Sequence, residues 1–235
     1  MQTRLCENKE SPIQYPKEQI NYIKGDTQRF ETSRGCPHNC PFCYEPMDRT
    51  HFSIPNITKN KVQILDMNFL YQPNIIERLN KLTNHIKVHG KVEIEAVCGV
   101  DFRLMNQDIA LALRQAGFVK IRFAWDWWMK DQYRIKDCLK WFLKAGYRAE
   151  DLMCFMLVNW KITYEECCRK LDLLKVWNVR VCDCCYDGGY LTLRHNSSSP
   201  IIAIPKYWVD KEILDFRKRC RKHNQIVRFK IDPEV

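Results

Sequence analysis

The feature that most constrains the fold is a repeated alternation of strand-like and helix-like segments. Short apolar runs rich in Val, Ile and Phe alternate with longer segments in which apolar residues recur at helical spacing. Strands are predicted at 29–33, 62–66, 91–97, 119–125, 152–158 and 179–184, and helices at 73–86, 107–116, 131–145 and 163–177. Because repeated strand–helix units join parallel strands through right-handed crossovers, the pattern predicts an α/β fold with a parallel sheet.

Three regions are predicted along the 235 residues. Residues 1–28 are polar and include two prolines, so we interpret them as an N-terminal extension lying over the domain. Residues 29–185 carry the alternating pattern and form the core. Residues 186–235 are expected to contain a polar linker, a helix at 209–222 and a last strand at 226–231.

Three cysteines lie close together in the loop after the first predicted strand. They are Cys36, Cys40 and Cys43, with the spacing C-x3-C-x2-C. An odd number of thiols this close cannot all pair as disulfides. Pro37 and Pro41 prevent a continuous helix, so the segment should wrap as a loop with converging sulfurs. Either an iron–sulfur cluster or a zinc ion with His38 or a distant cysteine as fourth ligand is compatible with this loop; no second C-x2-C pair or Cys/His pair follows at the short distance usual for zinc sites, which favours the cluster.

The cysteine motif, with Phe42 and Tyr44 on either side of its third cysteine, resembles that of the radical S-adenosylmethionine (SAM) superfamily. The resemblance implies three thiolates on a [4Fe-4S] cluster whose open iron binds SAM, and reductive cleavage of SAM to a 5′-deoxyadenosyl radical that abstracts hydrogen from a substrate. It also implies a partial (β/α)6 TIM-like barrel over residues 29–185. Beyond the resemblance, the helix–strand appendage of residues 186–235 is expected to close the open side of this barrel. An electron donor such as a flavodoxin or ferredoxin would be the partner.

Candidate SAM-binding residues follow from the same resemblance, because active-site groups of such barrels lie at the carboxyl ends of strands. Phe42 corresponds to the aromatic position near the adenine. Asp66 and Asn68 stand where many members have a Gly-Gly-Glu segment, a pattern from which this sequence departs. Asp126 and Asn159 follow the fourth and fifth strands, where they either contact SAM or serve in packing and capping.

Charged residues alternate with apolar ones in three of the predicted strands. Glu95, Arg122 and Arg180 are the residues of interest. If the apolar set packs against the outer helices, the charged set points into the barrel, where charges must be paired or meet a polar ligand. Two interpretations stay open: Glu95 and Arg122 neutralise each other, or Arg122 binds SAM and all three line a cavity for a polar substrate.

Other cysteines and three tryptophans have less specific interpretations. The spacing of Cys167, Cys168, Cys182, Cys184 and Cys185 matches no auxiliary-cluster motif, which favours core packing over a second metal site. Trp125, Trp127 and Trp128 either stack a base near the active site or anchor their loop to the following helix.

The formal net charge of +10 leaves the substrate class open. The densest basic segment, residues 217–222, is interpreted first as a solvated helix face and second as a nucleic-acid contact. A nucleic acid or nucleotide, or a partner protein or peptide, is the expected substrate, and a zinc-dependent nucleic-acid-binding protein is the alternative from another class.

No apolar run has transmembrane length and no leader is recognised, so a cytoplasmic protein without a membrane partner is expected. Thirteen cysteines suit a reducing compartment.

Overall fold

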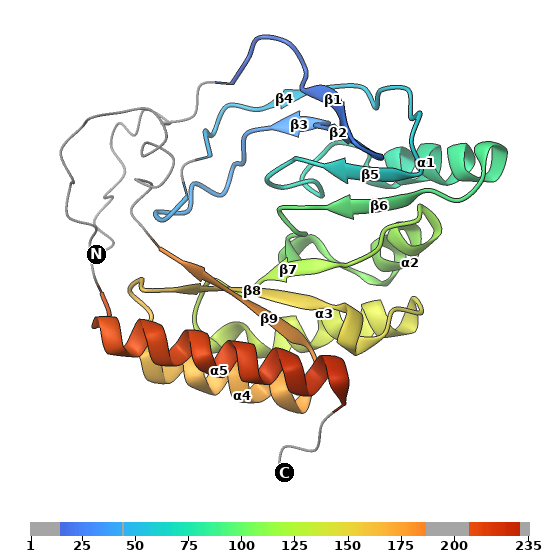
Figure 1. The fold of residues 1–235 in the computed structure, drawn as a ribbon. Coiled ribbons are helices and arrows are strands. Elements are labelled where there is room, and N and C mark those ends of the chain that lie inside the picture. Colours follow the sequence, from blue (N-terminus) through green and yellow to red (C-terminus); the bar gives the residue numbers. More distant parts are fainter. Residues whose placement is uncertain (1–14, 44, 187–206, 231–235) are drawn as a thin grey trace.

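Six parallel strands form the framework of the computed structural model, which describes residues 15–43, 45–186 and 207–230 (Figure 1). In chain order they are β2 (Thr27–Phe30), β5 (Lys61–Ile64), β6 (Glu93–Ala96), β7 (Arg122–Ala124), β8 (Met153–Val158) and β9 (Arg180–Cys185). The first three form one parallel ladder and the last three another. Parallel bridges from Ile94 to Phe118 and from Val100 to Phe123 connect the two ladders, so the strands follow one another in chain order.

Two antiparallel pairs flank this framework. β1 (Asn21–Lys24) pairs with β2, and β3 (Ser33–Arg34) pairs with β4 (Thr50–His51). Residues 21–24 therefore share a sheet with the predicted core, although the sequence placed them in the N-terminal extension. The boundaries predicted between the three regions stay predictions.

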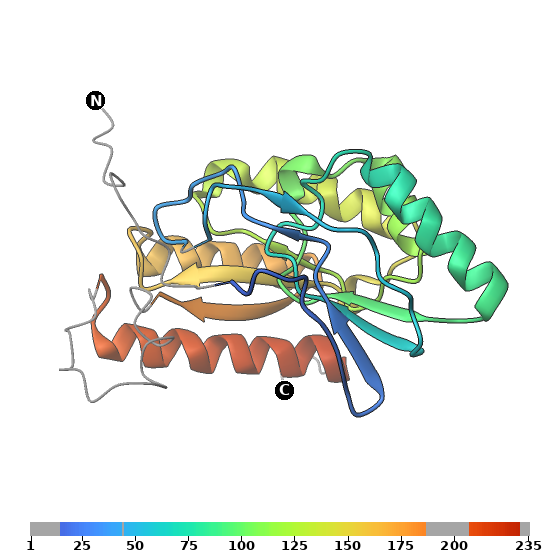
Figure 2. The ribbon, with the colours of Figure 1, turned by 90° about the horizontal axis from the view of Figure 1, so that it is seen from above.

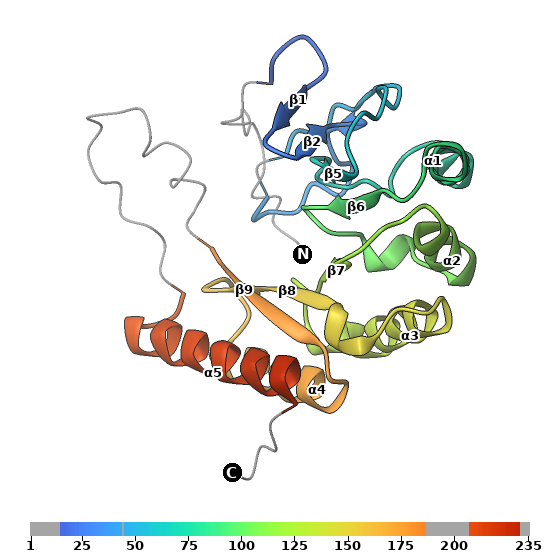
Figure 3. The same cartoon turned by 45° about the vertical axis from the view of Figure 1, so that its right-hand side comes forward.

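Helices connect the parallel strands, as the alternating pattern predicts. They are α1 (Ile75–His89), α2 (Gln107–Gln115), α3 (Gln132–Lys144) and α4 (Tyr164–Val176), with short 3-10 turns η1 (Phe102–Leu104), η2 (Met129–Asp131) and η3 (Ala149–Asp151). Figure 3 shows α1, α2 and α3 side by side along the same side of the strands. The α/β fold expected from the sequence is confirmed.

Local sequence signals account for the helix ends. The Asn106 side chain accepts a hydrogen bond from the Ile109 N–H at 2.9 Å and caps α2, and Thr163 caps α4 in the same way. Gly117 follows α2 with φ of 77°, and a Cβ there would lie 2.5 Å from the Val92 carbonyl oxygen. Only glycine fits this position, so the predicted helix stop has a steric cause.

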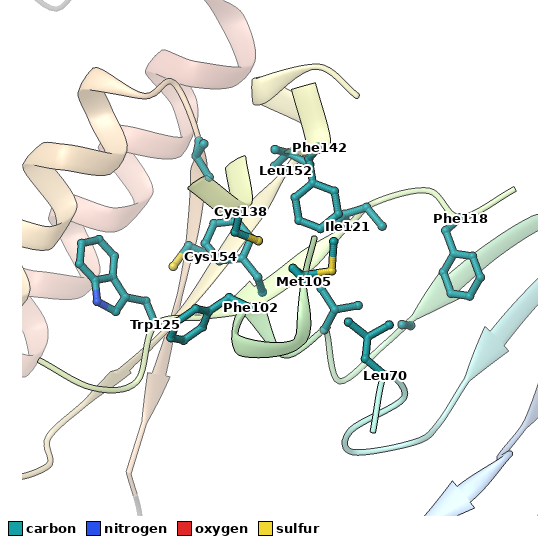
Figure 4. Packing of buried hydrophobic residues seen from close by; sticks show 14 of the residues in the cluster. Leu70, Phe102, Met105, Phe118, Ile121, Trp125, Cys138, Phe142, Leu152 and Cys154 are labelled. Carbon is teal, nitrogen blue, oxygen red and sulfur yellow. The ribbon is translucent and has the colours of Figure 1, made fainter. Parts of the chain in front are cut away.

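The hydrophobic core lies between the strands and the helices (Figure 4). Phe118, Phe123 and Phe142 are fully buried there. Figure 4 shows Cys138 of α3 and Cys154 of β8 in the same packed region. These two thiols fill core volume, as expected for part of the cysteine content.

The C-terminal part of the chain differs from the prediction. α5 (Asp210–Phe229) is one continuous helix that runs alongside β9 (Figure 2), so the strand expected at 226–231 is wrong as far as residue 229. Phe216, Cys220, His223 and Val227 recur at intervals of four, three and four residues and are all buried, which is a helical stripe. Residues 187–206 of the expected linker lie outside the described part of the chain.

None of the helices in the described ranges is long and apolar enough to cross a membrane.

Candidate functional site

The three cysteines of the motif border one cavity of about 410 Å³ at the carboxyl ends of the parallel strands. Its wall combines the cysteine loop with residues that end or follow five strands. These include Asn68 after β5, Asp101 and Arg103 after β6, Asp126 and Trp127 after β7, Leu157 in β8 and Cys184 in β9. The volume lies in the usual range for small-molecule and cofactor sites.

Close backbone contacts fix the conformation of the chain at the start of the cysteine loop. Gly35 has φ of 81°, and a Cβ at this position would lie 2.0 Å from the backbone oxygen of Asp48. The Gly35 N–H donates to Glu45 Oε1 at 2.7 Å, and the Cys36 N–H donates to the Pro46 carbonyl at 2.9 Å. The chain leaving the loop therefore packs directly on the chain entering it, which closes the loop around its thiols.

Asp66 fastens the segment that leads into this loop. Its carboxylate accepts hydrogen bonds from the Thr32 N–H at 2.6 Å, the Thr32 hydroxyl at 2.7 Å and the Ser33 hydroxyl at 2.7 Å. Gln72 donates to it at 3.0 Å. Asp66 is buried and does not border the cavity, so the structure places this predicted SAM contact behind the cysteine loop.

Burial disfavours the thiolate forms of the motif cysteines, which a bound cation such as an iron–sulfur cluster would stabilise. Loss of water raises the pKa of Cys40 to about 11; the Arg103 charge opposes this shift, whereas the Cys43 and Cys36 thiolates add to it. Burial also raises the pKa of Cys43. Among the described residues, no three His, Cys, Asp or Glu side chains are arranged to hold a single metal ion. Three thiols that border one cavity are a donor set compatible with a multi-iron cluster.

A polar network centred on Asp101 adjoins the thiols. Asp101 Oδ2 contacts His38 Nε2 at 2.6 Å and accepts from Asn68 Nδ2 at 3.2 Å, and Arg103 donates to both carboxylate oxygens at 2.7 and 2.9 Å. Asn68 Nδ2 also lies 3.5 Å from Cys36 Sγ. Burial opposes ionisation, but the Arg103 hydrogen bonds and charge hold the pKa of Asp101 below its usual value.

Asp101 and Arg103 are the site residues that the sequence analysis missed. They follow β6, at the end of a parallel strand where functional groups of such folds gather. The rule that selected Asp126 after the fourth strand would also have selected Asp101 after the third.

Asp126 and Trp127 line the cavity on a loop that α4 supports from behind. Lys170, fully buried in α4, donates to the carbonyl oxygens of Trp125, at 3.2 Å, and of Trp127. Burial raises the pKa of Asp126 to about 6, although the Lys170 charge opposes the shift. The carboxyl group therefore titrates near neutral pH in this cavity.

The aromatic residues near the site separate into two roles. Trp125 is fully buried and stacks on Trp177 with ring centroids 5.9 Å apart, so it anchors its loop. Trp127 and Phe42 both line the cavity, and their ring centroids are 5.2 Å apart. Phe42 also meets Trp160 at 5.8 Å. Trp128 is partly exposed and does not border the cavity.

Asn159 lies outside the cavity and connects distant parts of the chain. Its Oδ1 accepts from the backbone N–H groups of Tyr207 at 3.0 Å and Trp208 at 3.1 Å, and its Nδ2 donates to the Tyr186 carbonyl at 3.0 Å. The side chain thus holds the start of α5 against the end of β8. Its predicted contact with SAM stays a prediction.

Glu95, Arg122 and Arg180 also lie away from the cysteines. Glu95 forms an ion pair with Arg122 and accepts from Gln63 at 3.2 Å, so the two charges neutralise each other. Arg180 donates to the Asp151 carbonyl at 3.3 Å. Arg122 and Arg180 are the first residues of their strands, whereas the cavity lies at the opposite ends. The structure therefore does not bring these three to the cavity.

The additional cysteines lie on two elements, α4 and β9. Cys184 borders the cavity, Cys167 is buried with its thiol 3.7 Å from the Leu157 carbonyl oxygen, and Cys168 belongs to the same helix, α4. Cys182 and Cys185 lie in β9. In the parts of the chain that the structure describes, these residues form no metal-binding group.

No protein-family model matches the sequence, and no curated protein matches it. Among solved structures, the chain is similar to the radical S-adenosylmethionine methyltransferase TsrM from Kitasatospora setae. The form with cobalamin and a [4Fe-4S] cluster bound matches with TM-score 0.57 and 10% identity over 77% of this chain and 44% of that chain. The form with tryptophan substrate and the SAM analogue aza-SAM matches with TM-score 0.56 and 10% identity over 68% and 35%.

A further match is coproporphyrinogen III oxidase (HemN) from Escherichia coli, described as a radical SAM enzyme, with TM-score 0.49 and 14% identity over 71% of this chain and 41% of that chain. The chain spans less than half the length of each of these three chains. The two matches to TsrM, together with the parallel strand order and the position of the cavity, establish the fold. This α/β chain has the fold of the radical SAM enzymes.

Proposed function

We propose that the chain is a radical SAM enzyme that abstracts hydrogen from a polar substrate, with Cys36, Cys40 and Cys43 as ligands of a [4Fe-4S] cluster. The observation that carries the proposal is the position of these thiols: they lie on the loop between the first two parallel strands and border the cavity, in a fold shared with TsrM. We take the six parallel strands with their helices as a partial (β/α)6 barrel of the TIM type. When bound, the reduced cluster supplies the electron that cleaves SAM to a 5′-deoxyadenosyl radical.

The residues of the chain position the ligands and exclude water. Phe42 and Trp127 form an aromatic wall of the cavity, suited to the adenine of SAM. The Asp126 carboxylate is the acceptor for hydroxyl groups of the ligand. It is held in place because Lys170 and Glu166 of α4 bind the backbone of its loop, Glu166 accepting from the Met129 N–H at 2.6 Å.

A nucleic acid or nucleotide is the substrate class with a specific observation in its favour. The long helix α5 exposes basic residues along its outer face. They are Lys211, Lys218, Arg221, Lys222 and Arg228. Lys218 and Lys222 are one helical turn apart and pair with no acidic residue of the described ranges, so they are available to phosphates. Modification of a partner protein or peptide is the alternative.

The proposal also includes an external one-electron donor of the flavodoxin or ferredoxin type. No disulfide joins any two of the twelve cysteines of the described ranges, which supports a reducing compartment such as the cytoplasm.

Anaerobic reconstitution with iron and sulfide tests the proposed function. We expect about four iron and four sulfide per chain, a brown reducible cluster and formation of 5′-deoxyadenosine from SAM. The Cys36→Ala, Cys40→Ala, Cys43→Ala triple variant should lose all three. The double variant Cys98→Ala, Cys184→Ala is the matched control, because both thiols border the same cavity outside the motif. Binding of zinc without a cluster by the wild-type chain, or cluster formation by the triple variant, would contradict the proposal.

A further inference from the structure

The side chain of Asn68 connects a cysteine of the motif to the Asp101 network. Its Nδ2 lies 3.5 Å from Cys36 Sγ and 3.2 Å from Asp101 Oδ2. The side chain is 7% exposed and borders the cavity. The two hydrogens of the Asn68 amide nitrogen can therefore be donated to two acceptors, the Cys36 sulfur and the Asp101 carboxylate.

Asp101 determines which way this amide points. An ionised carboxylate only accepts hydrogen bonds, so it selects the NH2 group of Asn68 and excludes the orientation that would present the oxygen. Asp101 is itself fixed, because its Oδ1 accepts from the Arg103 backbone N–H at 3.0 Å and from Arg103 Nε at 2.7 Å. His38 Nε2, at 2.6 Å, is the third neighbour that holds the carboxylate in place.

The orientation leaves Asn68 Oδ1 buried without a hydrogen-bond partner in the described structure. An amide placed only to satisfy its own polar atoms would not leave its acceptor unpaired. A second N–H group also faces a thiol of the motif: the Glu45 backbone N–H lies 3.5 Å from Cys43 Sγ. Two of the three sulfurs therefore receive an N–H group from the surrounding chain.

We infer that Asn68 tunes the reduction potential of the cluster by donating an N–H hydrogen bond to the Cys36 sulfur, and that Asp101 is the positioning residue that orients it. Hydrogen bonds to ligand sulfurs are among the features that set the potential of iron–sulfur clusters. One-electron reduction adds negative charge, and a donor at a ligand sulfur stabilises the more negative state. The inference rests on the proposed function, because it needs a cluster at these cysteines.

The test is a redox titration of the reconstituted full-length chain, followed by electron paramagnetic resonance with chemical mediators. Asn68→Leu keeps the approximate shape and removes both donors, and Asn68→Ala removes them with less volume. Both should form the full cluster and show a more negative midpoint potential. The expected size is about a tenfold fall in the equilibrium constant for one-electron reduction, which corresponds to 59 mV.

Asn84→Leu, on the exposed part of α1, is the matched control and should leave the potential unchanged. An unchanged potential in Asn68→Leu and Asn68→Ala with full iron content would overturn the inference while the proposed function stands. Loss of the cluster from both variants would also overturn it, because Asn68 would then be needed to build the loop. Absence of a cluster in the wild-type chain would refute the proposed function itself.

Discussion

At the scale of single residues, the site depends on positions that carry no reactive group. Gly35 lets the chain turn into the cysteine loop against the backbone of Asp48, and Asp66 secures Thr32 and Ser33 in the segment that precedes the loop. The thiols contribute the ligands, but their mutual placement comes from these neighbours. A substitution beside the motif should therefore act on metal binding as strongly as a substitution within it.

Gly35→Ala should prevent cluster binding, and Gly146→Ala should not. Both glycines have positive φ, 81° and 91°, so an alanine at either position costs about 1–2 kcal/mol of backbone strain. At Gly35 the Cβ would also lie 2.0 Å from a backbone oxygen, whereas at Gly146 no atom lies within 4 Å. Iron content after reconstitution and urea unfolding of both variants check this. Equal stability and equal iron content in the two variants would contradict the steric argument.

The sequence predicted part of the site at this scale. Cys36, Cys40, Cys43, Phe42, Asn68 and Asp126 do border one cavity. Asp66 and Asn159 do not, because their polar atoms are used by backbone and side-chain groups 34 and 48 residues away, at Thr32 and Tyr207. Such contacts have no signature in the local sequence, so strand-end position alone could not distinguish a ligand-binding side chain from a structural one.

At the scale of secondary-structure elements, the predicted strands and crossover helices are recovered, and α5 is the exception. Its last turns contain Ile226, Val227 and Phe229, whose β-branched and aromatic character suggests a strand. Packing decides otherwise, because Val227 continues the buried stripe of Phe216, Cys220 and His223. Because α5 continues to Phe229, its basic face also includes Arg228, which lies beyond the helix predicted at 209–222.

Removal of two charges from that face should weaken nucleic-acid binding in a salt-dependent manner. The variant Lys218→Ala, Lys222→Ala removes two candidate phosphate contacts. The slope of log K against log salt concentration should become shallower by about 1.8 for duplex DNA and by about 1.4 for a single strand. Fluorescence anisotropy at several salt concentrations measures the slope.

The matched control is Lys140→Ala, Lys144→Ala, which removes two exposed lysines with the same spacing from α3. It should change the slope by less than half as much. Equal slopes for both double variants would indicate a diffuse effect of net charge, and no binding by the wild-type chain would favour a peptide or protein substrate.

At the scale of the whole molecule, pairing across the sheet determines where charges lie. Glu95 and Arg122 alternate with apolar residues as the sequence indicated, but they pair with each other and neither borders the cavity. The alternation pattern predicts which face of a strand a residue occupies, but it does not predict whether that residue lies beside the cavity. The lining of the cavity beside the cysteines does not include Glu95, Arg122 or Arg180, and their predicted role toward a substrate stays a prediction.

Stability of the whole chain should fall as the pH drops below about 6.5 because of His223, which joins α5 to the start of β9. Its Nε2 lies 2.7 Å from the Val179 carbonyl, and its Nδ1 is buried without a partner. Burial lowers the pKa of His223 in the folded state, so the unfolded chain binds the proton first as the pH falls. The contribution to the free energy of unfolding is largest above the unfolded pKa and decreases by up to about 1.4 kcal/mol per pH unit below it.

His223→Gln keeps an N–H donor for Val179 and removes the titration. From pH 7 to pH 5, the free energy of unfolding of the wild type should therefore fall relative to that of the variant. Urea unfolding at each pH measures both values. His89→Gln, at the exposed end of α1, should track the wild type. A wild-type curve parallel to that of His223→Gln would contradict the assignment.

Lys170 has a further consequence for how motion near the cavity can be observed. The ammonium group is fully buried between the carbonyls of Trp125 and Trp127, behind the loop that carries Asp126. An amine-acylating reagent reaches exposed lysines directly, but it reaches Lys170 only when α4 separates from that loop. The labelling rate of this one amine thus reports how often the cavity wall opens, without an engineered label in the chain.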